Sequence, residues 1–312
     1  MPPARRAFLA RLVDYAGLFP PAALDLDAAL QTYAAARGGE DAWMLGRFIV
    51  PAGTLGDLAA SADGPLRLSV LGHGSGEGST SWDDRAARTL ADARAVEAES
   101  DGALVCDRFE VRLPTAIDAD ALAQSLGALD EALGSGPGPA PRVALEAPFL
   151  DAPASLGPAV QAIADANGRA GRPAFALKLR CGGVTADLFP GVEALAEALA
   201  EALRAGVPFK ATAGLHHPVR QYRDEVGTEM HGFVNVFGGA VLARLHGLGP
   251  DALAEILDDT DPSHFELGDA LRWRSLSATA AEVADAREQS ALSYGSCSFD
   301  EPTDDLQALG WL

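Results

Sequence analysis

Short apolar runs of β-prone residues alternate with longer Ala- and Leu-rich runs along most of this chain. The alternation predicts seven strands, at Trp43–Val50, Leu66–Leu71, Arg108–Leu113, Arg142–Ala147, Phe175–Arg180, Phe209–Ala213 and Leu292–Phe299. Strands that alternate with helices pair in parallel and are joined by right-handed crossovers. Seven or eight such units in 312 residues favour an α/β fold, a (β/α)8 TIM-type barrel that occupies residues 1–312 as a single domain.

The final third of the chain is less regular. It contains three expected helices, at Met230–Leu245, Asp251–Asp258 and Thr279–Glu288. The segment His264–Ser275 is expected to be either the seventh barrel strand or a hairpin. Near the other end of the chain, Asp14–Leu24 contains two adjacent prolines and is expected to be a rigid loop ahead of a helix.

An open, doubly wound sheet is the alternative to a barrel. Such sheets commonly bind dinucleotides through a G-x-G-x-x-G turn after the first strand, and no such turn follows Trp43–Val50. The Gly-rich stretch 71–80 lacks the Gly-Lys-Ser/Thr sequence of a phosphate-binding loop. We therefore expect the barrel, and the sequence indicates no cofactor.

The chain is strongly acidic, with a net charge of −20 and an isoelectric point near 4.5. This charge argues against nucleic acid and anionic membrane surfaces as partners. Arg11 and Asp14 interrupt the first apolar run too early for a signal peptide, and no run approaches the length of a membrane span. We expect a soluble cytoplasmic protein whose partner is a small molecule, and a homo-oligomer is compatible with this composition.

Only two of the 24 basic residues are lysines, Lys178 and Lys210, and both lie in expected strands. A lysine amine can lose its proton whereas a guanidinium does not, so these positions are candidates for a base or a nucleophile. Alternate residues of a strand share a face, and we expect the polar residues of four consecutive strands to point into the barrel. They are Glu110, Arg112, Glu146, Lys178, Arg180, Lys210 and Thr212.

The ionisable members of this set are two carboxylates and four cations, with a formal charge of +2. A cationic pocket in an acidic protein predicts a site for a phosphate or a carboxylate. The alternative is an ion network that only fills the barrel, but burying six ionisable groups is costly unless they serve a ligand. Repulsion among the cations further predicts a lowered lysine pKa, with Glu146 or Glu110 placed to move protons.

The segment Lys210-Ala-Thr-Ala-Gly, on the sixth of the expected strands, resembles the Schiff-base lysine motif of class I aldolases of the deoxyribose-phosphate aldolase type. That motif reads Lys, small residue, Ser/Thr, small residue, Gly, on the sixth barrel strand. The resemblance covers five residues and implies that Lys210 forms a carbinolamine. It also implies a second lysine that lowers the pKa of the first, and here the candidate is Lys178, which lies on the preceding strand rather than the following one. The family shuttles protons with an aspartate, where this chain offers Glu110 or Glu146.

Two further groups of residues follow expected strands. His216 and His217 end the strand of Lys210, and Ser296 and Ser298 lie at the exit of the last strand, where barrels commonly bind phosphate. Adjacent histidines in an extended chain point to opposite sides and do not readily chelate one metal. We expect no bound metal, and we expect the histidines and serines to contact substrate.

Three functions are consistent with the sequence. The first is an enzyme that acts on a small anionic carbonyl compound through a lysine imine, by carbon–carbon cleavage, condensation or dehydration. The second is a metal-dependent hydrolase or isomerase that uses His216 or His217 with carboxylates. The third is a non-catalytic barrel that binds an anion or a partner.

Overall fold

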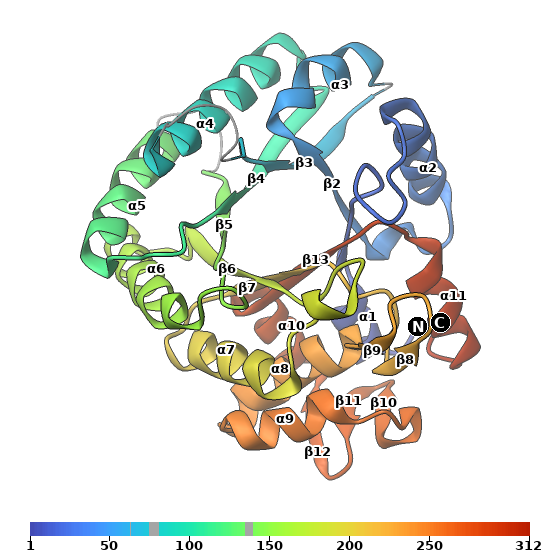
Figure 1. Ribbon diagram of the computed structural model, residues 1–312. Coiled ribbons are helices and arrows are strands. Elements are labelled where there is room, and N and C mark those ends of the chain that lie inside the picture. Colours follow the sequence, from blue (N-terminus) through green and yellow to red (C-terminus); the bar gives the residue numbers. More distant parts are fainter. Residues whose placement is uncertain (63, 75–80, 135–139) are drawn as a thin grey trace.

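The computed structural model describes residues 1–62, 64–74, 81–134 and 140–312. Parallel strands close into a barrel in the order β1, β2, β3, β4, β5, β6, β7, β13. They are Val13–Tyr15 (β1), Leu45–Pro51 (β2), Leu66–Leu71 (β3), Leu104–Arg112 (β4), Arg142–Glu146 (β5), Phe175–Arg180 (β6), Phe209–Thr212 (β7) and Ala291–Ser296 (β13). Figure 1 shows these strands at the centre of a ring of helices. The predicted (β/α)8 barrel is confirmed.

Helices cover the outside of the barrel. They are Pro3–Leu9 (α1), Leu26–Gly38 (α2), Leu55–Ser61 (α3), Trp82–Glu99 (α4), Ala119–Gly134 (α5), Leu156–Ala170 (α6), Val192–Arg204 (α7), Phe233–His246 (α8), Pro250–Asp258 (α9), Ala280–Gln289 (α10) and Asp300–Ala308 (α11). Their buried residues recur at helical spacing, as in α7, where Leu195 and Leu199 lie on the face toward the barrel. Ser81 and Thr279 begin α4 and α10 with capping boxes, which explains where these helices start.

The first strand of the barrel lies in a segment that the sequence did not indicate as a strand. Asp14–Leu24 was expected to be a loop, but Val13–Tyr15 forms β1, which pairs with β13 on one side and β2 on the other. The strand is only three residues long and is fully buried with a carboxylate at its centre, so it shows neither alternation nor a long apolar run. Because β1 comes first, β6 and β7 are the sixth and seventh barrel strands.

The segment His264–Ser275 does not supply a barrel strand. It contributes β10 (Phe265–Leu267) and β11 (Ala270–Trp273) to a three-stranded antiparallel sheet that β12 (Leu276–Thr279) completes. The hairpin reading was therefore right and the seventh-strand reading wrong. A second antiparallel pair, β8 (Gln221–Arg223) and β9 (Thr228–Met230), also lies between β7 and β13 in the sequence. Within the described ranges, no helix is long and apolar enough to cross a membrane.

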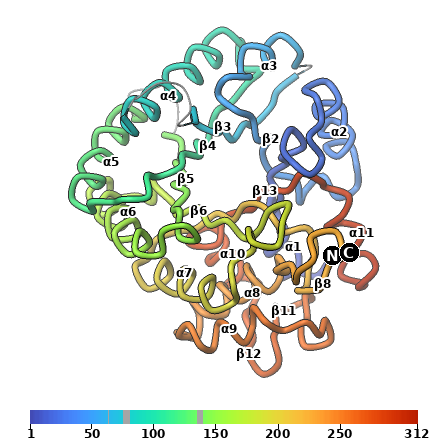
Figure 2. Tube along the Cα trace, viewed as in Figure 1, coloured from blue at the N-terminus to red at the C-terminus, as the bar shows by residue number. Residues whose placement is uncertain are grey.

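The two ends of the chain lie side by side (Figure 2), where Arg5 Nη2 donates to the carbonyl oxygen of Gly310 at 3.4 Å. This region also closes the barrel, because β1 is near the start of the chain and β13 near its end. Closure thus requires the first and last parts of the sequence to pack together.

Arg287 of α10 is buried beside this closure. Its guanidinium donates to the carbonyl oxygen of Phe8 at 2.9 Å and to that of Ala10 at 3.3 Å, and it also donates to Ala291 and Leu292. One charged side chain therefore satisfies carbonyls on both sides of the junction between α1 and β13. Burial lowers the pKa of Arg287 to about 9, which leaves the guanidinium protonated at neutral pH.

We predict that Arg287→Met lowers the free energy of unfolding by about 2–4 kcal/mol, because buried carbonyls lose a charged donor. The measurement is urea unfolding at pH 7. Arg244→Met on α8 is the control, since Arg244 is partly exposed and pairs with Asp285 at the surface. Its effect should stay within about 1 kcal/mol. Equal losses in the two variants would contradict the role given to Arg287.

Candidate active site

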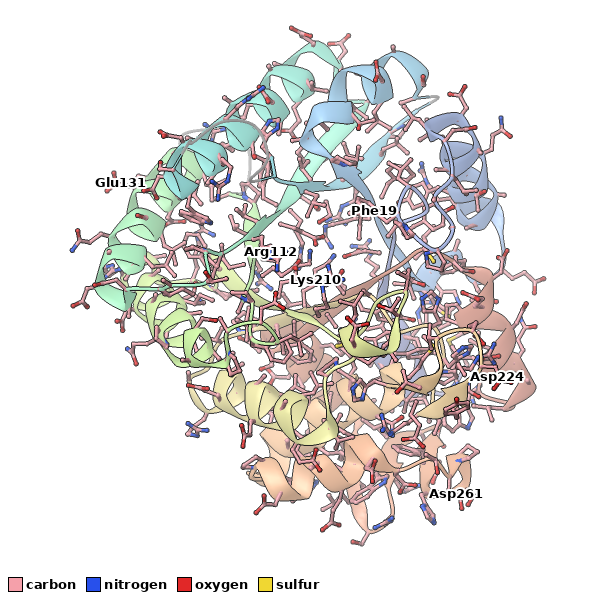
Figure 3. The ribbon with its side chains drawn as sticks, in the orientation of Figure 1. Phe19, Arg112, Glu131, Lys210, Asp224 and Asp261 are labelled. Atoms are coloured by element: carbon pink, nitrogen blue, oxygen red, sulfur yellow. The ribbon has the colours of Figure 1, made fainter. Side chains whose placement is uncertain are left out.

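A cavity of about 290 Å³ opens at the C-terminal ends of the barrel strands. Barrel enzymes place their active sites at this end. Its polar lining includes Glu110, Glu146, Lys178, Arg180, Thr212 and His216, and its apolar lining includes Phe19, Ile49, Leu71, Val184 and Leu188. Figure 3 labels Lys210 near the centre of the ring of helices, with Phe19 on a nearby loop.

The strand register brings the two lysines together. Lys178 of β6 lies level with Lys210 of β7 and with Glu146 of β5. Strand alternation then turns all three side chains inward. Both lysine side chains are buried, with 5% of Lys178 and 0% of Lys210 exposed.

Glu110 bridges the two lysine amines. Its Oε2 lies 2.8 Å from Lys178 Nζ and its Oε1 lies 2.8 Å from Lys210 Nζ. Ser69 of β3 donates its hydroxyl to the same Oε1 at 2.6 Å. Glu146 contacts Lys178 Nζ from the other side, also at 2.8 Å. Each amine therefore lies between two carboxylates, once the partner of Lys210 on β1 is included.

That partner is Asp14, which the sequence analysis did not include in the site. Its Oδ2 pairs with Lys210 Nζ and accepts a hydrogen bond from Ser293 Oγ at 2.8 Å. Its Oδ1 accepts the backbone N–H of Arg47 at 2.8 Å. The available signal was a single acidic residue inside the apolar run Leu12–Tyr15.

The two lysines differ in access to the cavity. Lys178 lines it, whereas Lys210 is fully buried behind Asp14 and Glu110 and is not among the lining residues that the structure describes. Of the two amines, that of Lys178 therefore belongs to a residue of the described cavity lining, and Glu110 connects it to the amine of Lys210.

The pKa values follow from this pairing. Burial alone would lower the pKa of Lys178, but Glu110 and Glu146 outweigh it and raise that pKa above its ordinary value. Burial alone would raise the pKa of Glu110 and of Glu146, but Lys178 lowers both, with Lys210 adding to the effect on Glu110. The expected lowering of a lysine pKa by repulsion among cations is therefore wrong for Lys178, because carboxylates separate the cations.

Arg112 does not point into the cavity as expected. Its side chain is 62% exposed and pairs with Asp151 at 3.1 Å. Arg112 is the last residue of β4 and still pairs with Glu146 of β5, but β3 ends opposite Glu110 and leaves Arg112 without a strand on that side. Without Arg112 and with Asp14, the site contains three cations and three carboxylates. The predicted charge of +2 is thus corrected to zero. Arg180 lines the cavity, is 38% exposed and lies 3.6 Å from Glu146.

The two histidines contact carboxylates of α11. His216 Nδ1 lies 2.8 Å from Glu301 and His217 Nδ1 lies 2.6 Å from Asp305, and these carboxylates are one helical turn apart. His216 also lines the cavity, whereas His217 is buried and is not among the described lining residues. Within the described ranges, no group of three or more His, Cys, Asp or Glu side chains is arranged to hold a metal ion.

The serines at the exit of β13 do not line the described cavity either. Ser296 is buried and its Oγ accepts the N–H of Ser298, while Ser298 Oγ accepts the N–H of Glu301 at the start of α11. They shape the turn into that helix, and Cys297 between them lines the cavity instead. Thr212 does line it, as expected for an inward residue of β7.

Two loops cross closely at the mouth of the barrel. Gly214 has a positive φ of 69°, which favours glycine, and a Cβ there would lie 2.7 Å from Gly182 Cα. This contact holds the segment after β7 against the segment after β6. Gly183 and Val184 of the latter segment line the cavity.

The chain has little similarity to the known proteins with which it was compared. No protein-family model matches the chain, and no curated protein matches it. A similar solved structure is the "crystal structure of a putative lyase/mutase from Burkholderia cenocepacia J2315", which is 16% identical over 75% of this chain and 80% of that chain, with a TM-score of 0.29. A TM-score this low carries no argument about activity.

We predict that Glu110→Gln lowers the free energy of unfolding at pH 7 by about 3–5 kcal/mol, because it leaves two buried ammonium groups with an incomplete set of partners. The deficit should shrink in acid. The folded pKa of Glu110 is lowered from 4.5, so its carboxylate stabilises the protein above about pH 4.5 and this stability is lost as the pH falls.

Urea unfolding at pH 7 and at pH 3.5 measures both effects. Glu266→Gln is the control, since Glu266 is exposed and pairs with Arg272 at the surface. A deficit for Glu110→Gln that is independent of pH would show that packing, rather than charge, accounts for the loss.

Proposed function

We propose that this protein is an enzyme, of a lyase-like kind, that acts on a small carbonyl compound through the amine of Lys178. The observation that carries the proposal is the position of Lys178 Nζ, which is at the cavity and lies 2.8 Å from both Glu110 and Glu146. A lysine at a barrel mouth with a carboxylate on each side has both a nucleophile and a proton acceptor in contact.

This proposal moves the reactive amine from Lys210 to Lys178. Lys210 lies on the seventh barrel strand, so the motif that it begins is not on the strand that the aldolase resemblance requires. Lys178 lies on the sixth strand, and the second lysine then lies on the following strand. Access supports the same choice, because only Lys178 of the two is among the described lining residues.

The first chemical step is a proton transfer. Lys178 gives a proton to Glu146. The neutral amine then attacks the carbonyl carbon while the carbonyl oxygen receives that proton from Glu146. Loss of water from the carbinolamine then gives the protonated imine. In the open cavity the pKa shifts oppose the first transfer. A substrate that expels water favours it, because desolvation disfavours both charged forms.

The cavity also limits the substrate. Arg180 is positioned to pair with a carboxylate or a phosphate, and it is already close to Glu146. Phe19, Ile49 and Leu71 form an apolar wall. A compact keto acid or aldehyde with one anionic group fits a volume of about 290 Å³.

A second mechanism is favoured by the raised pKa of Lys178. A permanent ammonium can polarise a carbonyl without forming a bond to it, while Glu146 removes a proton from the adjacent carbon. This mechanism needs a cation at position 178 but no nucleophile. The two mechanisms therefore differ in whether arginine can replace lysine.

We predict that borohydride reduction with pyruvate, glyoxylate or glyceraldehyde 3-phosphate traps an adduct on Lys178, located by peptide mass mapping. Lys178→Arg should abolish the adduct, whereas Lys210→Arg should slow trapping but leave the adduct at Lys178. Arg272→Gln, far from the cavity, should leave trapping unchanged.

An adduct at Lys210 would overturn the choice of lysine. If no compound is trapped, exchange of substrate α-protons with deuterated water tests the second mechanism. Exchange that survives Lys178→Arg but not Lys178→Met would support the ammonium role, and absence of both trapping and exchange would reject carbonyl chemistry for this panel.

A further inference from the structure

A second pocket lies at the opposite end of the barrel, where strands begin. It has a volume of about 390 Å³ and is lined by the start of β2, the residues just before and within β3, the segment after α1, and one side of α2. The N-terminal face of a barrel is not where catalysis occurs. A ligand there would serve another purpose than the reaction at the mouth.

Arginine dominates this pocket. Its lining contains Arg6, Arg11, Arg37, Arg47 and Arg67, and none of the described lining residues is a carboxylate. We call this the arginine pocket. Five of the 22 arginines of a chain with a net charge of −20 thus gather around one concavity. The cavity at the mouth, by contrast, balances two cations with two carboxylates.

Aromatic rings hold two of these arginines in place. The guanidinium of Arg6 lies 4.4 Å from the ring centre of Trp43, and that of Arg37 lies 6.0 Å from the ring centre of Tyr33. Ring contacts position a guanidinium without neutralising it, so both keep their charge available.

Carboxylates neutralise only part of the remaining charge. Arg47 and Arg67 share one partner, Asp107, and Arg47 also approaches Asp14 at 3.8 Å. Arg11 makes no side-chain hydrogen bond or ion pair within the described residues. Its backbone has a φ of 49°, and its N–H donates to the carbonyl oxygen of Trp43 at 3.0 Å, which holds it at the pocket.

Positive charge is also in excess in the barrel interior behind the pocket. Arg108 of β4 is 6% exposed, and its Nε and Nη1 have no hydrogen-bond partner among the described residues. Burial and the nearby Arg47 lower the pKa of Arg108 to about 10. Burial and Arg47 also lower the pKa of Arg142, at the start of β5. Asp14 and Asp107 raise the pKa of Arg47 itself, so the charge that lacks hydrogen-bond partners in this region is that of Arg108.

We propose that the arginine pocket binds a small phosphorylated compound that carries two or more negative charges. Guanidinium groups match phosphate oxygens with paired hydrogen bonds, and several of them can surround one compact polyanion. The overall charge of −20 repels a long polyanion such as nucleic acid, so a compact ligand fits this chain better. The pocket is separate from the mouth, and the proposal does not depend on the reaction there.

Calorimetric titration of the full chain with pyrophosphate tests this proposal, with inorganic phosphate as a second probe and potassium chloride at matched ionic strength as the blank. We expect one pyrophosphate per chain, bound more tightly than phosphate. Arg67→Gln and Arg11→Gln should each raise the dissociation constant about tenfold or more, since each removes a charged donor.

The matched control is Arg272→Gln. Arg67 and Arg272 are both 48% exposed and each pairs with a carboxylate, but only Arg67 lines the pocket. Arg272→Gln should leave binding unchanged. Circular dichroism verifies that each variant folds. Two pocket variants are used so that the test still holds if one of them does not fold. Absence of binding to the wild type, equal weakening by Arg272→Gln, or weakening by Arg180→Gln alone would overturn the proposal, the last by placing the anion at the mouth.

Discussion

The structure depends on the ion pairs that stabilise two lysines buried inside the barrel. A buried ammonium without a partner is very costly, so each amine needs carboxylates in contact. Asp14, Lys210, Glu110, Lys178 and Glu146 meet this need as a row of alternating charges across the barrel. Each carboxylate between two cations, and each cation between two carboxylates, is stabilised from both sides. Loss of one member would leave its neighbours unbalanced.

This row determines what the lysines can do. The carboxylates raise the pKa of Lys178 and favour its ammonium form. The same contact gives the amine a proton acceptor at 2.8 Å. In the proposed reaction, a substrate that removes water from the cavity would weaken the preference for charged forms. Lys178 and Lys210 together hold the pKa of Glu110 below its ordinary value.

The two ends of the barrel have opposite electrostatic designs. At the mouth, cations and carboxylates alternate and balance, whereas the arginine pocket has an excess of positive charge. Arg47 belongs to both regions, because it lines the arginine pocket and its backbone N–H donates to Asp14. The row of charges inside the barrel therefore extends from one face of the molecule to the other.

The sequence by itself determined the repeating strand–helix order, since apolar periodicity and Gly/Pro punctuation are local signals, and it identified the inward positions of Glu110, Glu146 and the two lysines by alternation. Tertiary structure decided the rest. Strand β1 is three buried residues that become a strand by pairing with β2 and β13, which are distant in the sequence, so no local pattern revealed it or Asp14. Without Asp14 the charge of the site, its pKa shifts and the strand number of each lysine were all misjudged. Exposure of Arg112 likewise depends on β3 ending opposite Glu110, short of Arg112, and strand pairing rather than alternation fixes that point.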